Sequence, residues 1–156
     1  MSMTYRVDLS IGLHPVWHDE PPRVQVSCHD QSHVFDLDRA VMLDFSFEAS
    51  GTQSLQVEFL NKKDQDTRTD LGLDKAVIID SVSFFAITDP RFVWQARYRP
   101  HYPEPWYSQQ VDQGSAPPGE LTNVDRLSWN GTWTLDFELP VFTWIHRLQD
   151  LGWIYR

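Results

Sequence analysis

Residues 132–139 read TWTLDFEL, and this stretch decides the fold class. Its large apolar side chains stand at every second position with polar side chains between them, a period typical of a β-strand with one face toward the core. The alternation of residues 77–79 does not continue in phase into Val82, which predicts a β-bulge near Asp80. Further alternating stretches are found at residues 24–28, 41–48, 55–59, 82–86 and 92–98.

Several short strands without helices between them predict an all-β fold, an antiparallel β-sandwich of the jelly-roll type. One short helix is expected at the C-terminal end, over residues 140–151. Pro140 is suited to open it, and Val141, Ile145 and Leu148 share one helical face. The 156 residues fit a single domain spanning residues 1–156.

The composition excludes several classes of partner. Lys and Arg number 13 and Asp and Glu number 22, so the net charge is −9. Such a surface is a poor partner for nucleic acid and for anionic membranes. The sequence shows neither a signal peptide nor an apolar run of membrane-spanning length, which predicts a soluble protein. The single Cys28 excludes an intrachain disulfide and a cysteine-based zinc site.

A polar connection at residues 60–75 is rich in acidic side chains. Carboxylate and amide oxygens at this density are ligands that a hard cation prefers, and calcium is the cation considered. The alternative is a solvated loop, because lysines and an arginine stand among the acids. The candidate metal ligands are Asn61, Asp64, Asp66 and Asp74.

The segment of residues 99–120 contains five prolines, too many for the interior of a sheet. Prolines stiffen the backbone, so aromatic rings can be displayed at low entropic cost. Such rings stack on sugars or fill a pocket of a partner, and the alternative is a lid folded over the sandwich. The candidate binding residues are Tyr98, Tyr102, Trp106, Tyr107 and, near the C-terminus, Trp153.

Two segments on either side of the acidic loop, LQVEFLN at 55–61 and DKAVIIDSVSF at 74–84, resemble the core of calcium-dependent xylan-binding modules. The resemblance implies a β-sandwich like that of carbohydrate-binding modules, calcium held in loops, and sugar hydroxyls bound through the calcium. The lysines between the acids depart from that pattern.

A second resemblance covers residues 55–156. The motifs YPEPWYSQQ at 102–110, LSWNGTW at 127–133 and PVFTWIH at 140–146 are similar to those of a group of small uncharacterised proteins of tailed bacteriophages, notably phages of cyanobacteria. This resemblance implies a place in the phage particle.

The function expected from these observations is non-catalytic: a structural protein of the phage virion, in the tail, neck or capsid surface. Its expected partners are other virion proteins and further copies of itself. The alternative is a calcium-dependent module that recognises a glycan on the host surface. A glycan-active enzyme is the third reading, with Asp136 and Glu138 two residues apart on one strand face, although acids so spaced are ordinary on a solvent-facing strand.

Overall fold

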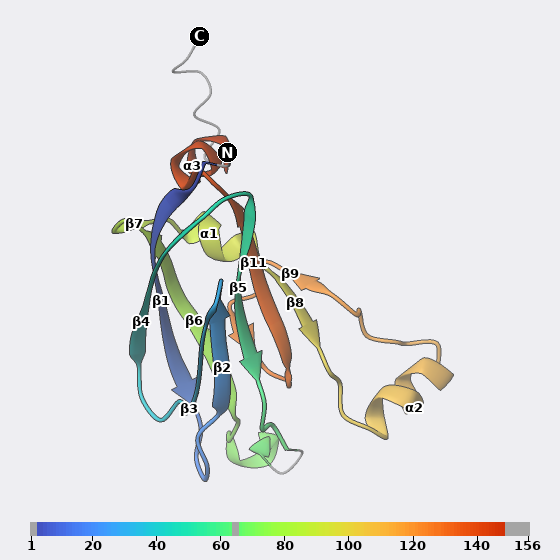
Figure 1. The fold of residues 1–156 in the computed structure, drawn as a ribbon. Coiled ribbons are helices and arrows are strands. Elements are labelled where there is room, and N and C mark those ends of the chain that lie inside the picture. The colour runs from blue at the N-terminus through green and yellow to red at the C-terminus, as the bar shows by residue number, and fades with distance from the viewer. Residues whose placement is uncertain (1–2, 64–65, 149–156) are drawn as a thin grey trace.

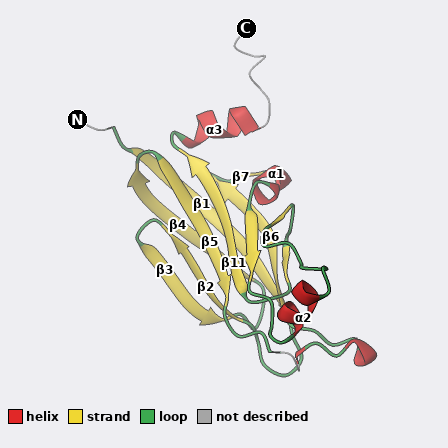
Figure 2. Cartoon of the chain, turned by 90° about the vertical axis from the view of Figure 1, so that its right-hand side faces the viewer, coloured by secondary structure: helices red, strands yellow, loops and turns green. Residues whose placement is uncertain are grey.

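The computed structural model describes residues 3–63 and 66–148, and its strands form two antiparallel sheets packed face to face (Figures 1 and 2). One sheet has the order β10-β6-β1-β4, with β7 paired to β6, and the other has the order β3-β2-β5-β11-β8-β9. The first sheet comprises β1 (Tyr5–Val16), β4 (Val41–Ala49), β6 (Ala76–Phe84), β7 (Ile87–Thr88) and β10 (Arg126–Leu127). The second comprises β2 (Arg23–Cys28), β3 (Gln31–Asp36), β5 (Thr52–Phe59), β8 (Arg97–Pro100), β9 (Leu121–Thr122) and β11 (Gly131–Glu138). The predicted antiparallel β-sandwich is therefore confirmed.

Short helices stand between and after the strands. In the described part of the chain they include the 3₁₀ turn η2 (Thr69–Leu71) and the α-helices α1 (Pro90–Trp94), α2 (Trp106–Asp112) and α3 (Val141–Leu148). None of the helices in the described part of the chain is long and apolar enough to cross a membrane.

The core lies between the sheets and extends under α1 and α3. Its largest fully buried apolar side chains are Phe45, Phe59, Phe84, Phe92, Tyr98, Trp133 and Phe137. Phe84 makes edge contacts with Phe92, Phe137 and Trp144, with ring centroids 5.0–5.5 Å apart. Val141 and Ile145 are 2% and 3% exposed. The helical face predicted for the C-terminal end is thus confirmed as the face that closes the sandwich, within the described residues.

The period of two predicted five strands correctly: β2, β4, β5, β6 and β11. The predicted bulge is also confirmed, because β1 pairs Gly12 with Ser81 but Leu13 with Ile79, so that Asp80 is the extra residue. The longest strand, β1, was not predicted, although Val7, Leu9, Ile11 and Leu13 repeat the same alternation and are all buried.

The strand predicted at residues 92–98 is wrong over its first half. Asp89 caps α1 by accepting a hydrogen bond from the Arg91 N–H, and Pro90 occupies the first helical turn. Both features favour a helix start over a strand. The Phe92 side chain extends from α1 into the core and is fully buried. Of the predicted strand, the part that joins the sheet lies in β8, Arg97–Pro100.

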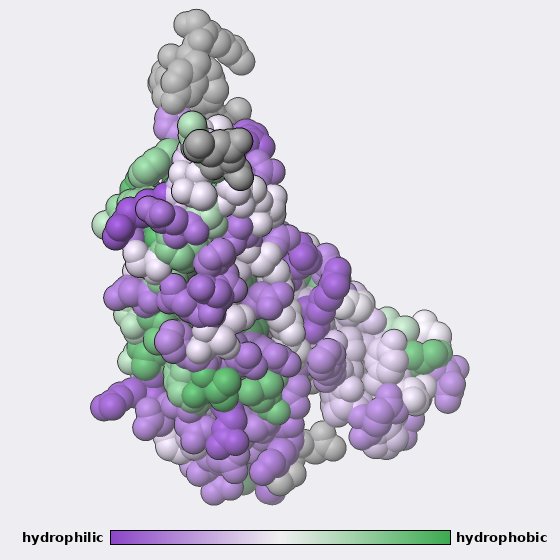
Figure 3. All heavy atoms as spheres, viewed as in Figure 1, coloured by the Kyte–Doolittle hydropathy of each residue, from purple (hydrophilic) through white to green (hydrophobic). Residues whose placement is uncertain are grey.

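The proline-rich segment is not wholly irregular, because it contains α2. We name residues 101–120 the arm. The arm leaves β8, projects away from the sandwich and returns to β9 (Figures 1 and 3), and α2 buries none of its residues. Sequence patterning did not predict α2, since a helix without a buried face leaves no apolar period.

Candidate functional site

A cleft of about 800 Å³ separates the arm from the end of the sandwich. Three segments line it: the β5–β6 connection, the arm, and the turn that precedes β11. The side chains that define its chemistry are Lys62, Asp74, Tyr102, Trp106, Trp129 and Asn130. The two long loops singled out in the sequence therefore meet at one place.

One wall of the cleft is aromatic and centres on Tyr102. Its ring contacts Trp106 at 5.7 Å, stacks on Tyr107 at 5.9 Å and meets Trp129 edge-on at 5.2 Å. The Tyr102 hydroxyl donates a hydrogen bond to the Pro118 carbonyl at 2.6 Å, which ties the outgoing half of the arm to the returning half. Trp106 and Tyr107 remain 39% and 38% exposed, so their rings are available to a ligand.

Tyr98 supports this wall from below. Its hydroxyl donates to the Trp129 carbonyl and accepts from the Trp129 N–H at 3.2 Å. Burial raises the pKa of the Tyr98 phenol far above its ordinary value of 10.0, so the hydroxyl stays protonated and able to donate. Tyr98 is only 1% exposed and pairs with Trp133 inside the sheet, so its predicted direct contact with a ligand is replaced by a supporting position.

The opposite wall is polar and centres on Asp74. Lys62 Nζ and Thr67 Oγ1 each donate to Asp74 Oδ1 at 2.7 Å, and Arg126 Nη2 donates to Asp74 Oδ2 at 2.7 Å. Partial burial alone would raise the pKa of Asp74, but the hydrogen bonds from Lys62, Thr67 and Arg126 outweigh it and hold this pKa well below its ordinary value. The carboxylate is therefore charged at neutral pH.

Asn130 joins the three segments of the cleft. Its Oδ1 accepts from the Lys62 N–H at 2.7 Å, its Nδ2 donates to the Lys62 carbonyl at 3.2 Å, and its own carbonyl accepts from the His101 N–H at 2.6 Å. The chain then passes so close to β8 that a Cβ on Gly131 would lie 2.4 Å from the Arg99 oxygen. The Asn130-Gly131 pair carries the chain from β10 in one sheet to β11 in the other, so it does not form a hairpin turn.

The predicted calcium ligands are engaged with nitrogen donors in the described part of the chain. Asn61 Oδ1 accepts from the Arg23 N–H at 2.6 Å, Asp66 Oδ2 lies 3.2 Å from Lys75 Nζ, and Asp74 is held as described above. These oxygens do not fit a calcium ion while the ammonium groups remain in place, and residues 3–63 and 66–148 contain no group of His, Cys, Asp and Glu suited to hold a metal. Asp64 lies outside the described residues. Calcium binding stays a prediction.

The other predicted site residues are placed as follows. Tyr102 and Trp106 line the cleft, Tyr107 stands beside them, and Trp153 lies outside the described residues. Sequence reasoning missed Lys62, Trp129 and Asn130 as members of the site, although Trp129-Asn130-Gly131 falls in a motif already noticed.

The carboxylates considered for hydrolysis lie elsewhere, on β11. Asp136 accepts from Arg97 Nη1 at 2.6 Å, and Glu138 pairs with Arg147 at 2.8 Å. Neither residue lines the cleft.

Comparisons with known proteins found solved structures that are similar to this chain. No protein-family profile matches the sequence, and no curated protein is similar to it at a significant level. One similar structure is vCBM60 in complex with galactobiose, with 16% identity, a TM-score of 0.48, and coverage of 82% of this chain and 96% of that chain. Another is the selenomethionine form of vCBM60, from work linking two families of calcium-dependent carbohydrate-binding modules by circular permutation, with 15% identity, a TM-score of 0.48, and coverage of 84% and 90%. At this level the similarity transfers no residue role to this chain.

Proposed function

We propose that this protein is a non-catalytic carbohydrate-binding module and that the cleft between the arm and the sandwich holds a neutral oligosaccharide. The observation that carries the proposal is the pairing of an aromatic wall, Tyr102, Trp106 and Trp129, with a hydrogen-bonding wall, Lys62 and Asn130. A sugar ring presents apolar C–H faces and polar hydroxyl edges, so it needs both kinds of wall.

The size and charge of the cleft narrow the ligand class. A volume of about 800 Å³ falls in the usual range for small-molecule sites and holds more than one sugar ring. Its charged lining residues are two lysines, Lys62 and Lys63, and two acids, Asp74 and Glu104, so the formal charges cancel. A balanced site favours a neutral glycan over an anionic polysaccharide.

Titration of the purified protein with a panel of neutral and anionic oligosaccharides tests the proposal. We expect Trp106→Ala to weaken binding of the recognised neutral sugar about 30-fold, the effect of losing one anchoring aromatic ring. Trp94→Ala is the matched control, because Trp94 is 40% exposed against 39% for Trp106 and does not line the cleft. Equal effects of the two variants, or no binding to any member of the panel, would refute the proposal. Repeating the titration with calcium and with a chelator shows whether calcium takes part.

A contact with protein is the second candidate for the arm. Its helix α2 buries no residue and exposes Trp106, Tyr107 and Val111, which suits an anchor in a partner pocket. This candidate retains the expected place in a phage particle, with another virion protein or a second copy of this chain as the partner. Sedimentation of the wild type and of Trp106→Ala separates it from sugar binding, since only a protein contact changes the sedimentation coefficient without added glycan.

A further inference from the structure

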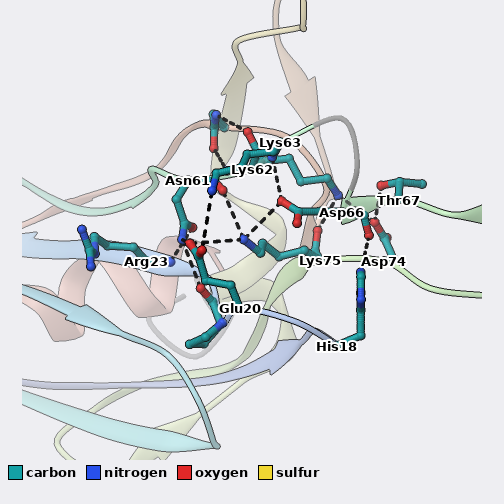
Figure 4. Close-up of polar contacts among 12 residues, drawn as sticks. His18, Glu20, Arg23, Asn61, Lys62, Lys63, Asp66, Thr67, Asp74 and Lys75 are labelled. Atoms are coloured by element: carbon teal, nitrogen blue, oxygen red, sulfur yellow. Dashed lines mark hydrogen bonds and ion pairs between the residues drawn. The ribbon is translucent and has the colours of Figure 1, made fainter.

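Lys75 is a fully buried lysine at the end of the sandwich, with 1% of its side chain exposed. Figure 4 shows its ammonium group pointing into a cluster of oxygen atoms. Nζ lies 3.2 Å from Asp66 Oδ2, 3.2 Å from the Asn61 carbonyl and 3.8 Å from Glu20 Oε1. Two carboxylates and a backbone carbonyl thus surround one nitrogen.

The oxygen atoms around Lys75 come from two connections that are far apart in the sequence. Glu20 lies between β1 and β2, Asn61 follows β5, Asp66 lies within the β5–β6 connection, and Lys75 immediately precedes β6. Glu20 thus belongs to the β1–β2 connection, and the other three residues belong to the β5–β6 connection. The ammonium group therefore links the β1–β2 connection to the β5–β6 connection, and the latter forms the polar wall of the cleft.

This donor set is of the kind that proteins otherwise use for a hard divalent cation. The separation of 3.2 Å from Asp66 is that of a long ammonium hydrogen bond and the 3.8 Å from Glu20 is within ion-pair distance, whereas calcium needs oxygens at about 2.3–2.6 Å. We propose that the Lys75 ammonium is a built-in substitute for a divalent cation: it occupies the position among Glu20, Asn61 and Asp66 that an ion would need, and it organises the connection without a metal.

The other charged and polar groups around this position support the assignment. Lys63 Nζ lies 3.5 Å from Glu20 Oε2, the Lys63 N–H donates to Asp66 Oδ2 at 2.7 Å, and His18 Nε2 is 2.9 Å from the Asp66 carbonyl. Asp66 is 4% exposed, so without Lys75 its charge would be buried, and among the described residues the remaining positive group near it is the ammonium of the more exposed Lys63. A divalent cation would then be the natural replacement.

The variant Lys75→Met tests this assignment, because methionine keeps most of the apolar stem and removes the charge. We expect its melting temperature in chelator to fall by on the order of 10 °C relative to the wild type, since one partner of a buried pair is lost. Calcium at about 100 times its dissociation constant should then raise the melting temperature of Lys75→Met by about 5–10 °C. The wild type should melt at the same temperature in calcium and in chelator.

The double variant Asp66→Asn, Lys75→Met is the matched control. It lacks both buried charges, so it should be more stable in chelator than Lys75→Met and should not respond to calcium. The readout is thermal stability, so failure of this inference leaves sugar binding untouched, and failure to bind sugar leaves this inference untouched.

Three results would overturn the inference. One is a wild type that calcium stabilises, because the position would then not be filled by the ammonium. Another is a Lys75→Met variant that gives the same melt, or the same absence of a folded state, in calcium and in chelator. The third is a double variant that responds to calcium as strongly as Lys75→Met.

Discussion

The substitution Tyr98→Phe removes one oxygen atom from beneath the cleft. It tests whether Tyr98 acts by supporting the aromatic wall, because the buried ring does not contact a ligand directly. The hydroxyl makes two hydrogen bonds, one donated to the Trp129 carbonyl and one accepted from the Trp129 N–H at 3.2 Å. Tyr98 is 1% exposed, so water does not reach it to replace the lost oxygen. Both backbone groups of Trp129 then lose their partner.

The expected cost follows from these contacts. A partly buried backbone group left without a hydrogen bond costs about 1–3 kcal/mol, and we expect a loss of about 2 kcal/mol in the free energy of unfolding. For a chain of this size that loss lowers the melting temperature by about 4–8 °C. Sugar affinity should fall as well, because Trp129 is no longer fixed against Tyr102, whose ring lies 5.2 Å away.

Urea denaturation measures the stability change as a shift of the midpoint at constant slope. Tyr107→Phe is the control, because it removes the same atom from a 38% exposed ring whose hydroxyl makes no hydrogen bond within the described part of the chain. A Tyr98→Phe variant that is within about 0.5 kcal/mol of Tyr107→Phe would show that the Trp129 backbone does not depend on this hydroxyl.

Two further predictions concern the polar wall and the turn before β11. The pKa of Asp74 is lowered in the folded state, so its contribution to stability is complete above the unfolded-state pKa of about 3.8 and is lost as the pH falls through the lower folded-state value. Asp74→Asn should therefore be less stable than the wild type at pH 6 and lose less stability on acidification, as followed by urea midpoints from pH 6 to pH 2. Gly131→Ala would place a Cβ 2.4 Å from the Arg99 oxygen and should cost more than about 2 kcal/mol, whereas Gly114→Ala, at φ +74° with open space around it, should cost only backbone strain in the same denaturation assay. Equal losses for the two glycine variants would contradict the close approach to β8.

The strands were predictable because a half-buried strand leaves a period of two in the sequence, and five of the expected strands occur where the alternation was noticed. The exception at residues 92–98 shows the weakness of a short apolar run. Phe92 belongs to a five-residue helix, and its side chain is buried just as it would be if the segment were a strand. The cap at Asp89-Pro90 was the stronger signal, since it concerns backbone geometry rather than burial.

The cleft was only half predictable. The aromatic residues of the arm were identifiable because prolines and rings alternate within one segment, from Tyr102 to Tyr107. The polar wall was not, since Lys62 meets Asn130 across 68 residues, and no local pattern encodes a contact between the end of β5 and the turn before β11. The acids of the β5–β6 connection were identifiable in the sequence, but the burial of Lys75 among them was not, because a lysine beside acids is typical of a solvated loop.

The polar wall is therefore held by charge rather than by strand pairing, and this determines how the cleft can vary. Asp66 and Lys75 are 4% and 1% exposed, so their attraction is weakly screened by salt, whereas exposed pairs such as Arg6 with Asp8 are strongly screened. Replacing both members of a buried pair by apolar residues often preserves stability, so we expect this pair to fix one conformation more than it adds to the free energy of unfolding. In this protein that conformation sets the backbone at Asn61 and Lys62, and Lys62 in turn holds Asp74 opposite the rings of the arm. The shape of the cleft thus depends on two ammonium groups, one buried beneath the connection and one lining the cleft itself.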